Sequence, residues 1–143
     1  MDGGNLAVLA LLDLSAAFDT VDHETLLNRL KRSYGLCGRV HDWFQSYLSG
    51  RFQSVRCGGT LSTPTQLVCG VPQGSVLGPI LFLLYTADLL RLVRAHGLEP
   101  HLYADDTQIY GFCRPGGCPQ LQQCVSICIS DVAQWMRSNR LQL

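Results

Sequence analysis

The stretch His101–Tyr110, "HLYADDTQIY", places two carboxylates side by side in a segment with the residue preferences of a β-hairpin. Asp105 and Asp106 form the middle of this segment. Two anions about 4 Å apart repel each other by about 4 kcal/mol at an effective dielectric constant near 20. A solvated turn disperses that repulsion, whereas a partly buried site needs a cation or a protonated carboxyl group. The hairpin therefore presents two alternatives, an ordinary exposed turn and a cation site.

A third carboxylate favours the cation site. Asp13 directly follows the unbroken apolar run Leu6–Leu12, whose length suits a strand buried on both faces, although its Leu and Ala content leaves a helix possible. A divalent cation at Asp105 and Asp106 needs another hard oxygen ligand from elsewhere in the fold. We interpret Asp13 as that ligand, and the alternative is an exposed strand tip.

The rest of the chain alternates between helical and hairpin patterns. Amphipathic or apolar spacing predicts helices at residues 20–35, 39–50, 80–97 and 120–140. Alternating residues around Gly58-Gly59 predict a hairpin over residues 52–70, and a loop rich in Gly and Pro follows at residues 70–79. Asp19 and Asp22 are interpreted as the entry and cap of the first helix, with Thr20 as an alternative cap. Strands and helices mixed without regular βαβ alternation predict an α+β fold.

Composition bounds the class of protein. The 143 residues suit one domain, residues 1–143, and 47% apolar with 15% charged residues is a globular composition. Eleven basic and eleven acidic residues give a net charge of zero, which is not the footprint of a self-sufficient nucleic-acid binder. Seven scattered cysteines without metal-ligand spacing predict reduced thiols and no zinc site.

Membrane and secretory signals are not expected. The apolar run Val76–Tyr85 is short and contains Gly78 and Pro79. The first residues carry Asp2 and no Lys or Arg, unlike a signal peptide. We therefore expect a soluble, intracellular chain without a membrane partner, and no pattern indicates an oligomeric state.

Three segments together resemble a known family. "LLDLSAAFDTVDH" (residues 11–23), "GVPQGSVLGPILF" (residues 70–82) and "YADD" (residues 103–106) are similar to three successive palm motifs of reverse transcriptases, in the same order. The wording is most similar to that of LINE-type, non-LTR retrotransposons, and the resemblance runs from about Leu6 to the end. It implies an RNA-directed DNA polymerase palm, an antiparallel sheet packed on helices. The palm would be truncated at both ends, without fingers or thumb.

The resemblance also assigns roles to the carboxylates. Asp13 and the backbone carbonyl of Leu14 would ligate two Mg²⁺ ions, with Mn²⁺ as a possible substitute. Asp105 would be the principal ligand from the hairpin, and Asp106 a weaker or supporting one.

Four further residues match positions near the substrates. Phe18 would be the steric gate that collides with a 2′-hydroxyl group and so favours deoxynucleotides. Gln73 and Gly74 would brace the incoming nucleotide and permit close approach of the template backbone. Tyr103 would support the hairpin near the primer end. Without the family pattern, Phe18 is an ordinary core residue and the loop around Gly74 an ordinary turn.

The implied partners are an RNA template, a DNA primer and deoxynucleoside triphosphates. We expect little or no polymerase activity and weak nucleic-acid binding from this piece alone, because the phosphate-gripping parts are missing. One alternative is a non-catalytic relic or repurposed interaction module. Another is an RNA polymerase or nuclease, although Phe18 and Ala104 argue against an RNA polymerase. The family analogy alone suggests a nuclear location.

Overall fold

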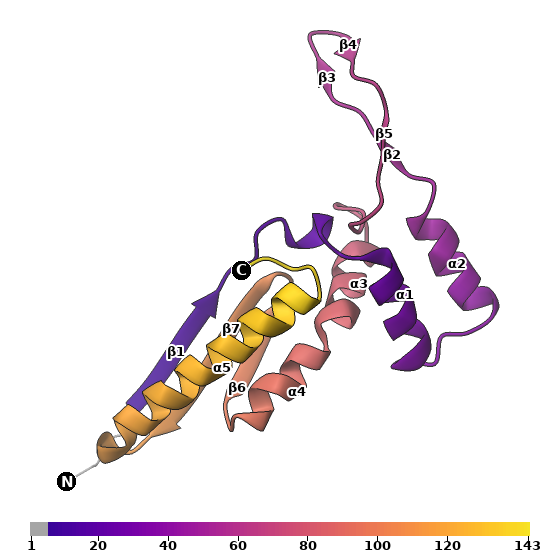
Figure 1. The fold of residues 1–143 in the computed structure, drawn as a ribbon. Coiled ribbons are helices and arrows are strands. Elements are labelled where there is room, and N and C mark those ends of the chain that lie inside the picture. Colours follow the sequence, from indigo (N-terminus) through magenta and orange to yellow (C-terminus); the bar gives the residue numbers. More distant parts are fainter. Residues whose placement is uncertain (1–5) are drawn as a thin grey trace. The chain divides into compact units, whose positions relative to one another are not determined.

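A computed structural model of the protein describes residues 6–143; Asp2, on which the expectation about a signal peptide rests, lies outside the described residues. The chain forms two compact units, one of residues up to Ala17 together with Thr86–Leu143, the other of Phe18–Tyr85. Helices and antiparallel strands are both present, which confirms the α+β class (Figure 1). The expectation of a single domain over residues 1–143 stays a prediction.

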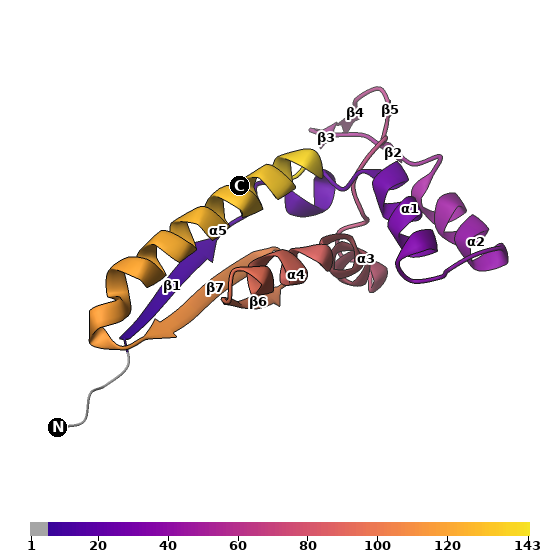
Figure 2. The same cartoon turned by 60° about the horizontal axis from the view of Figure 1, so that its bottom comes forward.

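The first unit is a three-stranded antiparallel sheet with helices on one face. The strand order is β1-β7-β6. Two helices, α4 and α5, pack against the sheet (Figure 2). The elements are β1 (Leu6–Leu12), α4 (Asp88–Ala95), β6 (Glu99–Tyr103), β7 (Asp106–Cys113), the 3-10 turn η2 (Pro115–Gly117) and α5 (Cys118–Ser138). The buried side chains of this unit include Leu89, Val93, Leu98, Ile109, Val125, Cys128, Val132 and Met136.

Strand β1 differs from the prediction. It is a strand, as expected, but it is not buried on both faces, since Leu9 and Leu11 are 57% and 68% exposed. Among the described residues 6–143, the strand lies at the edge of the sheet and pairs with β7 alone. Val8, Ala10 and Leu12 alternate with the exposed leucines and are partly covered. A continuous apolar run therefore encodes an edge strand with one uncovered face.

The second unit holds two amphipathic helices, a third helix, and an arm (residues 51–69) built from two pairs of short strands. Its elements are the 3-10 turn η1 (Ala17–Asp19), α1 (His23–Arg32), α2 (Arg39–Leu48), β2 (Phe52–Gln53), β3 (Arg56–Cys57), β4 (Thr60–Leu61), β5 (Thr65–Gln66) and nearly all of α3 (Leu77–Thr86). Strand β2 pairs with β5 and β3 with β4, which confirms the hairpin around Gly58-Gly59. The core includes Leu26, Leu30, Leu48, Leu81, Phe82 and Tyr85.

The prediction of one continuous helix over residues 80–97 is wrong. The structure has α3 and α4, separated at Ala87. Side chains of α3 such as Phe82 are buried in the second unit, and those of α4 such as Leu89 in the first. The sequence at the break contains neither Gly nor Pro. Packing therefore explains the break, because each helix buries its side chains in the core of a different unit.

The start of α1 confirms its predicted cap. Asp22 accepts hydrogen bonds from the backbone N–H and the hydroxyl of Thr25, at 2.9 and 2.7 Å. His23 donates a hydrogen bond from Nε2–H to the carbonyl oxygen of Gly70 at 2.7 Å, so its side chain ties the start of α1 to the loop at Gly70. Within residues 6–143, no helix is both long and apolar enough to cross a bilayer.

Gly70 begins the loop before α3 under tight constraints. Its φ of +88° is left-handed, and an added Cβ would lie 3.0 Å from the carbonyl oxygen of Asp19. Its N–H donates to the carbonyl of Val21, and the next N–H, of Val71, donates to the carbonyl of Phe18. These bonds hold the loop against η1.

We expect Gly70→Ala to destabilise the protein more than Gly59→Ala. The two glycines have nearly the same φ, +88° and +87°, but a Cβ at Gly59 meets nothing within 4 Å. The backbone strain is therefore matched, and the clash should add about 1–3 kcal/mol at position 70 alone. Urea unfolding followed by circular dichroism measures the difference. Equal midpoints for the two variants would contradict the packing described for Gly70.

We also expect Cys128 to resist alkylation. Burial, with contributions from Cys124 and Asp131, raises the pKa of the Cys128 thiol to about 11. At pH 8 only about one thiol in a thousand is then ionised, and the thiolate is the reactive form. Peptide mass spectrometry after iodoacetamide treatment should show slow labelling of Cys128 and fast labelling of the exposed Cys57. The difference should vanish in denaturant, and equal native rates would refute it.

Candidate active site

The hairpin β6–β7 presents the acidic pair. Tyr103 pairs with Asp106, so the connection consists of Ala104 and Asp105. Ala104 has a φ of 53°, a left-handed conformation that costs a residue with a Cβ about 1–2 kcal/mol. Asp105 therefore belongs to this strained two-residue turn, whereas Asp106 is the first residue of β7.

The register of β1 on β7 brings Asp13 to the same place. Leu12 pairs with Thr107, so Asp13 follows the last pair on one strand while Asp106 precedes it on the other. Beyond Asp13, the N–H of Ser15 donates to the carbonyl oxygen of Gln142 at 2.9 Å. The segment is thus held on both sides of Asp13.

Asp13 and Asp106 line one hollow of about 280 Å³, and the other lining residues are Leu11, Leu12, Thr107 and Gln108. Both carboxylates are exposed, and the half-buried Asp105 is not part of this lining. The structure therefore brings together two of the three predicted catalytic carboxylates at one hollow.

The two carboxylates of this hollow are suitable ligands for a hard cation, but they form only part of a ligand set. Carboxylate oxygens are the ligands that Mg²⁺ prefers. Among residues 6–143, no group of three or more His, Cys, Asp or Glu side chains is arranged to hold a metal ion. Metal binding by Asp13, the Leu14 carbonyl, Asp105 and Asp106 stays a prediction.

Tyr103 lies at the end of β6 with 75% of its surface exposed. Because it pairs directly with Asp106, it closes the hairpin next to the hollow. Its expected support of the primer end stays a prediction.

In the second unit, the three predicted nucleotide-binding residues meet. Phe18, Gln73 and Gly74, with Pro79, line a hollow of about 170 Å³. The Phe18 ring lies 5.0 Å from the ring of Phe82 between centroids, inclined by 41°. Phe18, for which a gate role is predicted, therefore faces a hollow and is braced by an aromatic contact.

Asp19 has a role that the sequence did not reveal. It was interpreted as a helix entry, but its Oδ1 accepts a hydrogen bond from Nε2 of Gln73 at 3.0 Å. The bond joins residues 54 positions apart, and no local spacing could have indicated it. Gln73 is thus oriented by η1.

Comparison with known proteins gives a consistent result. Residues 2–143 match the family described as "Reverse transcriptase (RNA-dependent DNA polymerase)". The chain is 37% identical over 100 residues to the probable RNA-directed DNA polymerase from transposon BS of Drosophila melanogaster, covering 66% of this chain and 11% of that protein. It is 34% identical over 114 residues to the RNA-directed DNA polymerase from mobile element jockey of the same organism, covering 76% and 12%.

A third relative is the probable RNA-directed DNA polymerase from transposon X-element of Drosophila melanogaster, 42% identical over 78 residues, covering 54% of this chain and 8% of that protein. The chain thus spans about a tenth of the length of these relatives, which are polymerases of LINE-type elements. Since the family match extends over essentially the whole sequence, the chain belongs to the reverse transcriptase family.

Proposed function

We propose that this chain carries catalytic residues of an RNA-directed DNA polymerase of a retrotransposon. The observation that carries the proposal is the shared hollow of Asp13 and Asp106 at one end of the β1–β7 pair, in a member of this family. The proposed partners are an RNA template, a DNA primer and deoxynucleoside triphosphates, in the context of the longer polymerase.

In the proposed reaction the 3′-hydroxyl oxygen of the primer attacks the α-phosphorus of the triphosphate. A new P–O bond forms, the bond to the β-phosphate oxygen breaks, and pyrophosphate leaves. Asp13, the Leu14 carbonyl, Asp105 and Asp106 would hold two Mg²⁺ ions, which supply charge neutralisation and activation of the attacking hydroxyl.

The second unit supplies the proposed nucleotide contacts. Phe18 would exclude a 2′-hydroxyl group from the sugar position, and its packing on Phe82 would keep the ring from yielding. Gln73 would brace the nucleotide while its amide nitrogen remains bonded to Asp19. Gly74, with a φ of +74° and no chain atom within 4 Å of an added Cβ, leaves open space beside it.

A second candidate is a non-catalytic relic or repurposed interaction module. Two observations favour it: the chain has zero net charge, and Asp105 does not join the hollow of Asp13 and Asp106. Positioning of substrates supplies much of the catalysis of phosphoryl transfer, and carboxylates alone do not provide it.

Exchange of this segment into an intact polymerase tests the proposal. We expect the jockey polymerase carrying residues 6–143 in place of its own corresponding segment to extend a primer on RNA. Asp13→Asn, Asp105→Asn or Asp106→Asn should each reduce extension by at least about 100-fold, because stabilisation of developing charge is lost. The control is Asp42→Asn, at an exposed position on α2. Silence of the exchanged protein despite intact folding would favour the relic.

Sugar selectivity tests the gate separately. In the same exchanged polymerase, we expect Phe18→Val to raise ribonucleotide incorporation relative to deoxynucleotide incorporation by at least about 10-fold, because a smaller side chain leaves room for the 2′-hydroxyl. Single-nucleotide extension kinetics with each sugar give the ratio. Phe82→Leu is a useful comparison, since it loosens the support of the ring and should raise the ratio less. An unchanged ratio in Phe18→Val would remove Phe18 from this role.

A further inference from the structure

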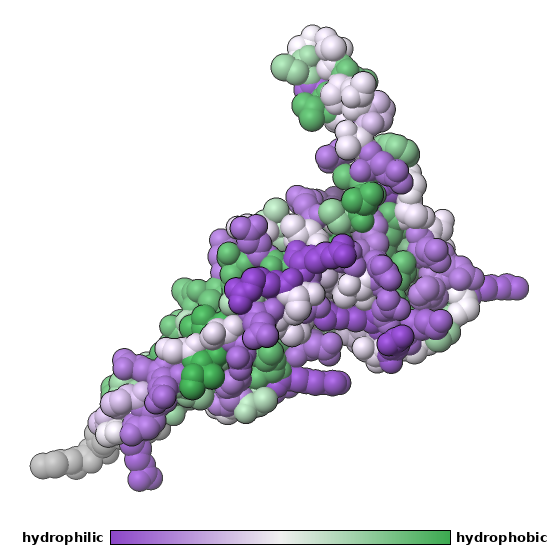
Figure 3. Space-filling view, viewed as in Figure 1, coloured by the Kyte–Doolittle hydropathy of each residue, from purple (hydrophilic) through white to green (hydrophobic). Residues whose placement is uncertain are grey.

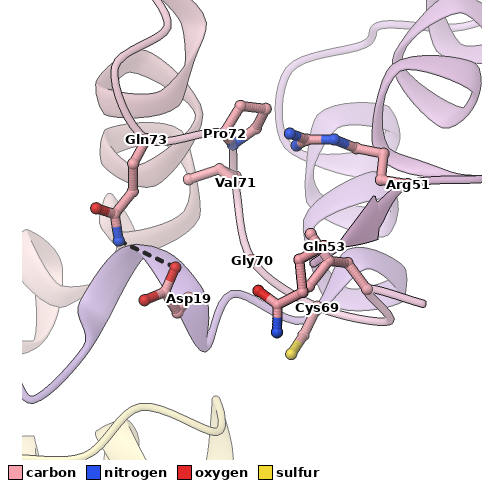
Figure 4. Close-up of a pocket in the computed structure, with 9 residues that line it drawn as sticks. Asp19, Arg51, Gln53, Cys69, Gly70, Val71, Pro72 and Gln73 are labelled. Atoms are coloured by element: carbon pink, nitrogen blue, oxygen red, sulfur yellow. Dashed lines mark hydrogen bonds between the residues drawn. The ribbon is translucent and has the colours of Figure 1, made fainter. Parts of the chain in front are cut away.

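A larger hollow lies at the base of the arm of the second unit. The arm comprises residues 51–69, including the paired strands β2–β5 and β3–β4. The hollow has a volume of about 520 Å³ (Figure 4). It is lined by Asp19, Arg51, Gln53, Leu67, Cys69, Gly70, Val71, Pro72 and Gln73. None of the carboxylates assigned to catalysis belongs to this lining.

The charge of this region differs from that of the whole chain. Between Asp42 and Asp88 the sequence contains no Asp or Glu, and its only basic residues are Arg51 and Arg56. Although the whole chain has zero net charge, the only charged side chains between these two positions are therefore arginines. Such a stretch attracts polyanions.

Arg51 supplies the cation of the hollow. Its guanidinium group extends toward Pro72 in Figure 4, on the side opposite Asp19. No ion pair joins it to a carboxylate within the described residues 6–143. A guanidinium group without a carboxylate partner suits a phosphate, which it can bind through two parallel hydrogen bonds.

Asp19 adds an oriented acceptor. Its Oδ1 is fixed by the amide of Gln73 at 3.0 Å, and the carboxylate faces the hollow (Figure 4). A carboxylate repels phosphate but accepts a hydrogen bond from a hydroxyl group. A cation and a carboxylate at one hollow therefore match a ribose-phosphate unit, whose 2′-hydroxyl is the group that distinguishes RNA from DNA.

The arm offers apolar surface beside this charge. Phe52, Val55 and Leu61 are 61%, 70% and 57% exposed. In Figure 3 green hydrophobic patches lie on the arm at the top of the view. Phe52 lies between Arg51 and Gln53, which both line the hollow, but Phe52 is not part of that lining, because side chains alternate along a strand. Its exposed ring is therefore a stacking surface on the arm outside the hollow.

We propose that the hollow and the arm form a binding site for single-stranded RNA. Arg51 pairs with a backbone phosphate, and Asp19 accepts a hydrogen bond from a ribose 2′-hydroxyl. The site deepens the proposed polymerase function by naming residues that contact the RNA partner, and it rests on that function for the choice of RNA.

Fluorescence anisotropy tests the site on the 143-residue chain. The probes are a labelled single-stranded RNA about 12 nucleotides long and DNA of the same sequence. Binding is measured over a range of salt concentrations with EDTA present. The wild-type chain should bind RNA more tightly than DNA. Arg51→Gln should weaken both and lower the slope of log affinity against log salt by about 0.7, the share of one phosphate contact.

Matched variants separate specific contacts from net charge. Arg91→Gln, at an exposed position on α4, makes the same charge change outside the site and should leave the slope unchanged. Asp19→Ala, which removes the acceptor, should bring the RNA-to-DNA affinity ratio close to one. Circular dichroism confirms that each variant is folded.

Three outcomes would overturn the site: no RNA binding by the wild-type chain at low salt, equal slopes for Arg51→Gln and Arg91→Gln, or an unchanged RNA-to-DNA ratio in Asp19→Ala. Because EDTA removes divalent cations, a failure here is distinct from a failure of the carboxylates in primer extension.

Discussion

The pairing of β1 with β7 is the constraint on which the candidate site depends. The pair Leu12–Thr107 sets Asp13 beside Asp106, and both carboxylates reach one hollow only in this register. Side chains alternate between the two faces of a strand, so a slip by one residue would turn Asp13 toward the face covered by α5. The candidate site therefore depends on this register, because only the register places the two carboxylates on the same face.

Packing on the helix-covered face helps to enforce that register. Gly111 of β7 is buried, and an added Cβ there would lie 2.7 Å from Leu98 and 2.8 Å from Leu121 of α5. The buried Ile109 and Thr107 follow on the same face. One face of the sheet is thus fixed by close packing while the opposite face carries Asp106 and the exposed leucines of β1. Stability and chemistry are divided between the two faces, as a rigid support for a functional site requires.

Local patterns in the sequence predicted much of this fold, and long-range contacts account for the rest. The hairpins, the Asp22 cap and the final helix follow from turn residues, capping and helical spacing, which act over a few positions. The edge position of β1 depends on what covers the strand, and the break at Ala87 depends on which unit buries each helix. In the site, the motifs indicated Asp13, Asp105 and Asp106, of which Asp13 and Asp106 line one hollow and Asp105 does not. The bond between Asp19 and Gln73 spans 54 positions, so no local pattern indicated it.

That bond has a consequence for how the second unit handles its ligands. Asp19 lines the larger hollow, and Gln73 lines both the larger and the smaller one with Phe18. The bond is exposed to solvent, so water competes for both partners, but it still favours one orientation of the Gln73 amide. A ribose hydroxyl bound by Asp19 would share the carboxylate with Gln73 and so alter the strength with which that amide is held. The residue proposed to brace the nucleotide is thus coupled, through a single carboxylate, to the hollow proposed for RNA.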